Sequence, residues 1–260
     1  MDKNKVLKHK PCFVSFATQK GGAGKTTLTI LVAGMAHYVY GYNVAVIDCD
    51  EHQYSLSRMR ERDNSIVYKS ETLRRIASDQ FLTHHKASYP VVGTKVVDAH
   101  DIASGLKQAD GSDYDLIFFD VQGSAGTTGW ISLLASMDYI FLPFVPDMLN
   151  IESTEQTMKV LKYLVESGES KTVLSAFWNK IDIRERKDMI ELGNTIIREL
   201  DVNVMSTMLP MLSRYHDKLT GTTTKNDVFM CTLLSPTNNL LKDSCIEELC
   251  EEMFKIMWHN

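Results

Sequence analysis

The sequence predicts an α/β fold, in which a mostly parallel β-sheet carries helices on both of its faces. Three observations predict it. Short, continuously apolar segments such as residues 116–119 are typical of strands that are buried on both faces. These segments alternate with helical patterns along the chain, as in a parallel sheet. The 260 residues, 44% hydrophobic and 23% charged, are enough for one full core.

The expected elements alternate from one end of the chain to the other. Strands are predicted at residues 12–18, 43–49, 91–97, 114–121, 138–145, 172–178 and 202–207. Helices are predicted at residues 25–40, 72–87, 98–109, 150–166, 186–200 and 239–258. No repeat or Pro/Ser-rich linker divides the chain. We therefore predict an N-terminal extension at residues 1–11 and a single domain at residues 12–260.

Charge and cysteine content exclude several classes of protein. The net charge of −5 argues against nucleic-acid binding over the whole surface. The five cysteines contain no C-x-x-C pair, which argues against a secreted disulfide framework and against a zinc site of the usual spacing. The apolar run behind the N-terminal lysines is too short for a signal peptide, and no stretch approaches the roughly 20 apolar residues that span a bilayer. We expect a cytoplasmic protein.

A glycine-rich loop follows the first predicted strand and opens the first predicted helix. It reads Lys20-Gly21-Gly22-Ala23-Gly24-Lys25-Thr26-Thr27. The standard pattern G-x-x-x-x-G-K-[ST] would need a glycine where Gln19 stands. Glycines let successive backbone N–H groups point at phosphate oxygens, and the helix N-terminus adds a partial positive charge. We expect Lys25 to neutralise the outer phosphates and the Thr26 hydroxyl to ligate Mg²⁺.

The arrangement K-G-G-x-G-K-[ST] resembles the deviant Walker A loop of the ParA/MinD superfamily of ATPases. The resemblance implies a P-loop NTPase fold with ATP and Mg²⁺ as cofactors. It also implies that Gly21, Gly22, Ala23, Gly24 and the residues 25–27 hold the phosphates. In that family the first lysine reaches across a dimer to the nucleotide of the other subunit. This role falls on Lys20 and implies an ATP-dependent homodimer.

Three acids end two of the predicted strands. Alternation along the second strand places Asp48 and Asp50 on the same side, where two carboxylates repel unless a cation or water network lies between them. The resemblance implies that Asp50 orients the attacking water and that Asp48 lies nearer the water shell of the magnesium. Asp120 ends an apolar strand in the Walker B pattern and is expected to hold Mg²⁺ directly or through water.

Two segments beside these acids depart from the family pattern. Glu51 and His52 stand where a proline is common, which leaves the geometry of this first switch segment open. We expect residues 122–128, with Gly123, to form a second switch beside the γ-phosphate. The resemblance further implies that Asn179 reads the adenine and that Pro210 packs on the base. Asn179 is equally compatible with a turn, because asparagine favours such positions.

The residues of the last predicted helix indicate whether the protein would bind a membrane. Its apolar stripe consists of Ile246, Leu249, Cys250, Met253, Met257 and Trp258. The opposite face carries Glu247, Glu248, Glu251 and Glu252. A helix that binds an anionic leaflet gains ~1 kcal/mol from each Lys or Arg near the surface, so four glutamates oppose binding. We therefore expect a helix that packs in the core.

DNA binding rests on basic residues that are each accompanied by acids. The groups are Arg58, Arg60, Arg62, Arg74 and Arg75; Lys180, Arg184, Arg186 and Lys187; and Arg214 and Lys218. A dimer would pool two such patches, and weak non-specific binding needs only a few phosphate contacts. Non-specific DNA binding stays open as a hypothesis.

The resulting interpretation is a ParA-type ATPase whose ATP-bound dimer is active and whose slow hydrolysis is stimulated by a partner protein. Its cargo is expected to be DNA in plasmid or chromosome partition. Residues 118–151 also resemble ParA-type proteins of bacterial conjugative elements, which favours DNA transfer instead. A dethiobiotin-synthetase-like ligase of the same superfamily and a MinD-like positioning ATPase remain alternatives. A nitrogenase-iron-protein-like reductase would need paired cysteines after the Walker B strand, and none lies between Cys49 and Cys231.

Overall fold

The computed structural model describes residues 10–50, 54–121, 129–182, 187–224 and 227–258. Within them the chain forms a seven-stranded, all-parallel sheet of order β3-β2-β4-β1-β5-β6-β7. The strands are β1 (Cys12–Phe16), β2 (Val44–Asp48), β3 (Val91–Gly93), β4 (Leu116–Asp120), β5 (Tyr139–Phe144), β6 (Val173–Ile181) and β7 (Asn203–Pro210). Each overlaps a predicted strand, and the predicted fold class is confirmed.

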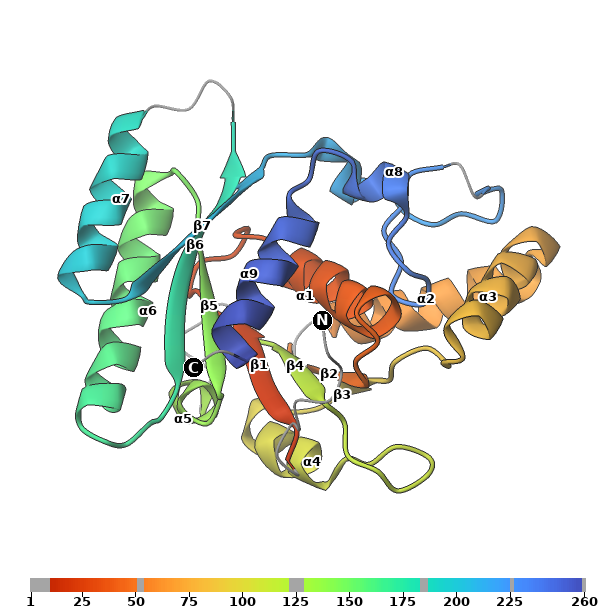
Figure 1. Cartoon of the computed structure of the whole chain (residues 1–260), viewed down its shortest axis with the longest axis horizontal. Helices are drawn as coiled ribbons and strands as arrows, with labels where there is room; N and C mark the ends of the chain where they lie inside the picture. Colours follow the sequence, from red (N-terminus) through yellow and green to blue (C-terminus); the bar gives the residue numbers. More distant parts are fainter. Residues whose placement is uncertain (1–9, 51–53, 122–128, 183–186, 225–226, 259–260) are drawn as a thin grey trace.

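Helices cover both faces of this sheet (Figure 1). One face carries α1 (Lys25–Gly34) and α9 (Ile246–Trp258), and the other carries α4 (Ala99–Gly105), α5 (Trp130–Ala135), α6 (Met148–Glu166) and α7 (Lys187–Glu199). Neighbouring strand residues pack into the hydrophobic cores on opposite faces of the sheet. Phe118 packs with α1 and α9, whereas Phe119 packs with the helices of the other face. Continuous apolar strands are therefore buried on both sides, as predicted. No helix of the described chain has the length and apolar character to cross a membrane.

The pair α2 (Ser55–Lys69) and α3 (Glu71–His84) packs on a third cluster formed with residues 219–234. Only α3 was predicted. A buried carboxylate, Asp63, interrupts the apolar stripe of α2, which consists of Leu56, Met59, Ile66 and Val67, and thereby hides its helical period. This carboxylate is fully buried and accepts hydrogen bonds from the backbone N–H and hydroxyl of Thr232 at 2.8 and 3.0 Å. Arg62 pairs with its other oxygen at 2.6 Å.

The predicted helix 239–258 is wrong as a single element. It consists of α8 (Asn238–Leu241) and α9, separated by a turn in which Asp243 and Cys245 have φ of 54° and 56°. The Ser244 hydroxyl accepts a hydrogen bond from the backbone N–H of Ile246 at 3.2 Å, where α9 begins. The apolar stripe of α9 is buried, with Trp258 partly buried at its end, so its predicted role in the core is confirmed.

Three further differences concern short elements. The predicted helix 25–40 ends as α1 at Gly34 and continues as one π-helical turn, η1 (Met35–Val39). The six-residue α5 is too short to show a helical period and was not predicted. Two 3₁₀ turns, η2 (Val96–Asp98) and η3 (Ser213–His216), complete the described elements.

One glutamate of α9 completes the edge of the sheet. The β6–β7 register slips between the pairs Ala176–Val204 and Trp178–Met208, so β7 bulges there. The Glu252 carboxylate accepts the backbone N–H groups of Ser206 and Thr207 at 2.6 and 2.9 Å. The sequence places Glu252 on the helix face opposite the apolar stripe, and in the structure its carboxylate satisfies the backbone N–H groups of the bulge.

Candidate functional site

The glycine-rich loop lies where β1, a central strand, passes into α1. Gly22 and Gly24 have φ of 85° and 88°, in the left-handed region that favours glycine. A Cβ atom at Gly24 would lie 2.9 Å from Nδ2 of Asn179. Both features explain why small residues form the loop. The ten-residue α1 begins at Lys25 and directs the N-terminus of a helix at the loop.

The two loop lysines have different surroundings. Lys25 is 9% exposed, and its ammonium donates to the carbonyl oxygen of Lys20 at 3.2 Å. Burial lowers the pKa of Lys25, while the carboxylates of Asp120 and Asp50 act in the opposite direction. The Lys20 ammonium instead lies at the surface, 2.9 Å from a carboxylate oxygen of Asp147 at the start of α6.

Asp120 ends β4 beside the loop and is 3% exposed. Burial raises the pKa of Asp120 to about 7, and a hydrogen bond from the Thr26 hydroxyl partly opposes the effect. The negative charges of Asp48 and Asp50 raise this pKa as well. Four of the predicted residues, Thr26, Asp48, Asp50 and Asp120, therefore interact at one place.

This arrangement fits a magnesium ion. A hydroxyl and a buried carboxylate, from Thr26 and Asp120, form the oxygen donor set that Mg²⁺ takes beside phosphates. Burial makes the ionised form of Asp120 costly, and a bound cation would offset this cost. Asp48 fits a direct ligand less well, because its two carboxylate oxygens accept the backbone N–H groups of Ser57 at 2.8 Å and Asp50 at 3.3 Å. It thereby caps the first turn of α2 and contributes its negative charge at a distance.

Asn179 is brought to the loop from the end of β6. It is 6% exposed, and its amide donates to the carbonyl oxygen of Ala23 at 2.8 Å. Pro210, at the end of β7, pairs in register with Ile181. Pro210 and Ile181 line a cavity of about 990 Å³ that extends to α8 and the start of α9. The predicted adenine residues thus lie on neighbouring strand ends, with Asn179 at the phosphate loop and Pro210 at the cavity.

Some of the predicted site lies outside the described residues. These positions are Glu51 and His52 of the first switch segment and residues 122–128 of the second.

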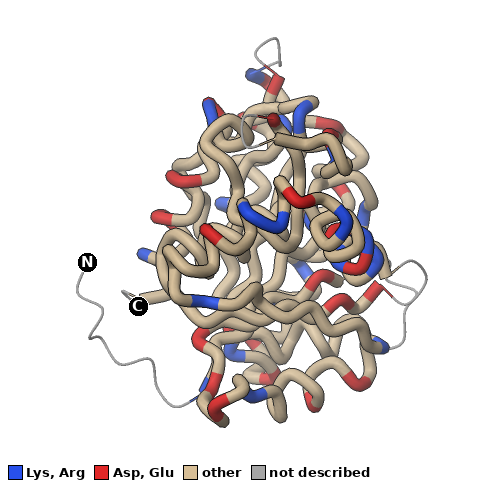
Figure 2. Tube along the Cα trace, turned by 90° about the vertical axis from the view of Figure 1, so that its right-hand side faces the viewer, with Lys and Arg blue, Asp and Glu red and all other residues tan. Residues whose placement is uncertain are grey.

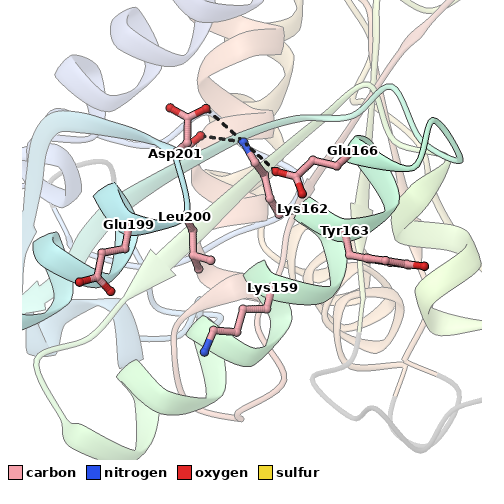
Figure 3. Close-up of a pocket in the computed structure, with 7 residues that line it drawn as sticks. All are labelled: Lys159, Lys162, Tyr163, Glu166, Glu199, Leu200 and Asp201. Atoms are coloured by element: carbon pink, nitrogen blue, oxygen red, sulfur yellow. Dashed lines mark hydrogen bonds and ion pairs between the residues drawn. The ribbon is translucent and has the colours of Figure 1, made fainter.

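A separate small cavity of about 200 Å³ lies between the ends of α6 and α7 (Figure 3). Lys162 lies across it and pairs with Asp201 at 3.3 Å and Glu166 at 3.8 Å, as the dashed lines in Figure 3 show. None of the predicted site residues lines it. We therefore place the site at the phosphate loop.

Several basic residues considered for DNA binding serve internal contacts. Arg60 donates to the carbonyl oxygens of Tyr89 and Thr232, both at 2.6 Å, and Arg62 pairs with the buried Asp63. Along the backbone drawn in Figure 2, positions of Lys and Arg are interspersed with positions of Asp and Glu. The contacts of Arg60 and Arg62 leave fewer basic side chains of α2 available to bind DNA phosphates.

Sequence reasoning missed two residues at the site, Asp147 and Lys180. Asp147 caps α6, accepting the backbone N–H of Asn150 at 3.0 Å, a position that its residue type favours. Nothing in the sequence pairs it with Lys20, 127 positions away. Lys180 was counted among scattered surface bases, but its ammonium donates to the carbonyl oxygen of Gly22 at 2.6 Å.

Residues 14–220 match the family described as CbiA, the CobQ/CobB/MinD/ParA nucleotide binding domain. No curated protein matches the chain.

Solved structures share the fold at low sequence identity. The ATP complex of an aspartate-to-alanine variant of Cyanothece McdA is 14% identical, with 95% of this chain and 98% of that chain covered and a TM-score of 0.56. The cobyrinic acid a,c-diamide synthase of Mycobacterium smegmatis with ADP and magnesium is 15% identical, covering 78% and 87%, with a TM-score of 0.53. The MinC:MinD cell division complex of Aquifex aeolicus is 17% identical, covering 78% and 83%, with a TM-score of 0.52.

Proposed function

The chain belongs to the CobQ/CobB/MinD/ParA nucleotide-binding family, and from this premise we propose that it is an ATP-dependent dimerising switch that hydrolyses ATP. ATP with Mg²⁺ brings two copies together, and hydrolysis to ADP and phosphate returns them to monomers. The observation that carries the proposal is the contrast between the two loop lysines. Lys25 is buried at its own loop, whereas Lys20 extends to the surface beside exposed Asp147. A lysine in this position is available to the nucleotide of a second copy.

In the proposed reaction the loop N–H groups and Lys25 bind the phosphates and stabilise the charge that develops on them. Thr26 and Asp120 would hold Mg²⁺, which supplies electrostatic stabilisation of the phosphate oxygens when bound. Asp50 lies near enough to affect the pKa values of Lys25 and Asp120. Its carboxylate would accept a hydrogen bond from the attacking water and orient it. Lys20 of each copy completes the site of the other.

The proposed cargo is DNA, in partition or in conjugative transfer, with hydrolysis stimulated by a partner protein. This assignment follows from the resemblance of the phosphate loop and residues 118–151 to ParA-type proteins. Arg60 and Arg62 are engaged in contacts within the protein. Contacts with DNA would therefore come from other Lys and Arg residues, contributed by both copies of the dimer. The buried stripe of α9 leaves it without an apolar face for a membrane, which disfavours MinD-like membrane positioning through this helix.

Phosphate release from ATP tests the proposal. The wild type should hydrolyse ATP slowly, Lys25→Ala should lose nucleotide binding, and Asp50→Ala should bind ATP without hydrolysing it. Exposed Lys171→Ala is the matched control and should behave as wild type. Hydrolysis that needs a small carboxylic acid as co-substrate, with a ligated product, would contradict the switch and identify a ligase of the same superfamily.

A further inference from the structure

Lys180 holds an unusual position at the phosphate loop. It directly follows Asn179 and has φ of 58°, a conformation that residues with a Cβ atom rarely adopt. Its backbone N–H donates to Oδ1 of Asn179 at 2.9 Å, which stabilises this turn. Its side chain then passes Gly24, with Cε 3.7 Å from where a Cβ atom would lie, and ends on the carbonyl oxygen of Gly22. The turn therefore aims Lys180 at the loop.

Among the described residues, Lys180 is one of three side chains that donate hydrogen bonds to carbonyl groups of the loop. Lys25 donates to the carbonyl of Lys20 at 3.2 Å, Lys180 to that of Gly22 at 2.6 Å and Asn179 to that of Ala23 at 2.8 Å. The described chain contains no cis peptide bond. In a trans peptide the C=O and the following N–H point in opposite directions. Each contact thus turns one N–H group away from its side-chain donor.

The N–H groups turned away from Lys180 and Asn179 belong to Ala23 and Gly24. Successive N–H groups that point to one side form an anion-binding concavity, which positive φ values at alternate residues favour. Gly22 and Gly24 have such values. Without the donors, peptide planes next to glycine would rotate at little cost, because glycine populates positive and negative φ about equally. Lys180 and Asn179 therefore restrict the loop to the geometry that receives phosphate.

We propose that Lys180 is a positioning residue that pre-forms the phosphate loop by holding the Gly22 carbonyl, so that the Ala23 N–H is aimed at a phosphate of the bound polyphosphate. This inference rests on the proposed binding of a nucleoside triphosphate by the same loop. The role differs from that of Lys25, which is placed to neutralise the phosphates themselves. It predicts that Lys180 contributes to the affinity for any polyphosphate, with or without a base.

Calorimetric titration of the full chain with pyrophosphate and with ATP, both with Mg²⁺, tests the proposal. Lys180→Met keeps the apolar stem and removes the donor, Lys180→Arg keeps a donor, and exposed Lys171→Met is the control for loss of one surface charge. Lys180→Met should weaken pyrophosphate and ATP by the same factor, about tenfold, as expected for a charged hydrogen bond. Lys180→Arg should recover most of the loss, and the thermal midpoint of ligand-free Lys180→Met should fall by no more than about 4 °C, as expected for the loss of one hydrogen bond.

Two results would overturn the inference alone. In one, Lys180→Met weakens ATP but not pyrophosphate, which would assign Lys180 to the base. In the other, Lys180→Met binds both ligands as Lys171→Met does, which would make it an ordinary surface lysine. A wild type that binds neither ligand would overturn the proposed function together with the inference.

Discussion

The Lys20 ammonium and the Asp147 carboxylate form an ion pair of 2.9 Å that joins the phosphate loop to the start of α6. Their side chains are 37% and 53% exposed, and a pair so open to water contributes at most about 1 kcal/mol. In the proposed dimer, Lys20 would therefore exchange Asp147 for a phosphate of the second copy at little cost. In this structure the ion pair holds Lys20 within its own subunit.

Asp147→Asn should strengthen ATP-dependent dimerisation, because Lys20 no longer has to leave a carboxylate. The exposed pair limits the gain to about fivefold for each subunit. Asparagine still caps α6, so the thermal midpoint should stay close to that of the wild type. Sedimentation of Asp50→Ala and Asp50→Ala/Asp147→Asn with ATP measures the difference, with exposed Glu152→Gln on α6 as the control. A weaker dimer would show that Asp147 supports the interface instead.

Magnesium removal should abolish hydrolysis, and Thr26 and Asp120 should carry this dependence. Asp120→Asn and Thr26→Val should each lower the hydrolysis rate about 100-fold or more, because each removes a donor placed beside the phosphates. ATP affinity titrated with and without EDTA should depend on Mg²⁺ less in either variant than in the wild type. The exposed Asp101→Asn serves as the control. An unchanged magnesium dependence in both variants would place the ion elsewhere.

Asp63→Asn should destabilise the protein without altering the structure of the phosphate loop. Asparagine keeps the shape but weakens the bonds that a buried carboxylate accepts from Thr232 and Arg62. Because Arg62 is partly exposed, we expect a loss of about 2 kcal/mol in the free energy of unfolding. Urea unfolding measures it, with neighbouring exposed Glu61→Gln as the control. A loss no larger than that of the control would mean that α2 is held by its apolar contacts alone.

The contribution of Glu252 to stability should depend on pH. Burial acts to raise the pKa of Glu252, but hydrogen bonds from Thr207 and Ser206 outweigh it and lower the pKa below the ordinary value of 4.5. A carboxylate with a lower pKa in the folded state stabilises it above the unfolded-state pKa, and this stabilisation is lost as the pH falls through the folded-state pKa. Glu252→Gln should therefore reduce the free energy of unfolding near neutral pH, by about 1 kcal/mol.

The measurement for Glu252 is urea unfolding of the wild type and Glu252→Gln from neutral to acidic pH. The difference between the two should shrink as the pH falls below 4.5. Exposed Glu251→Gln on the same helix is the control and should show a small difference. A difference that is constant with pH would mean that the β7 bulge does not depend on the charge of Glu252.

Much of the fold could be predicted because its strands can be recognised from short, local sequence segments. Leu116 to Asp120 reads as a buried strand without reference to any other segment. The helix α2 could not be predicted, because Asp63 replaces an apolar side chain at a buried position and its partner, Thr232, lies 169 positions away. The turn between α8 and α9 depends on left-handed residues other than glycine, Asp243 and Cys245, which local propensity disfavours.

The candidate site divides in the same way. Lys25, Thr26 and Asp120 follow from local motifs at strand ends, and the structure places them together. Lys20 was noticed from its position in the loop, but its contact with Asp147 depends on how β5 lies beside β1. Lys180 was assigned to a charged surface because its aim at Gly22 depends on a backbone turn that sequence patterns do not reveal.

Light scattering after size exclusion tests the dimerising switch most directly. Asp50→Ala should trap bound ATP, so it should have the mass of a dimer with ATP and Mg²⁺ and of a monomer with ADP. Adding Lys20→Ala to this variant should return the ATP-bound protein to a monomer, while ATP binding itself is retained. If protein that is confirmed to bind ATP has the same mass with ATP as with ADP, the result would contradict the account and favour a metabolic enzyme of the same family.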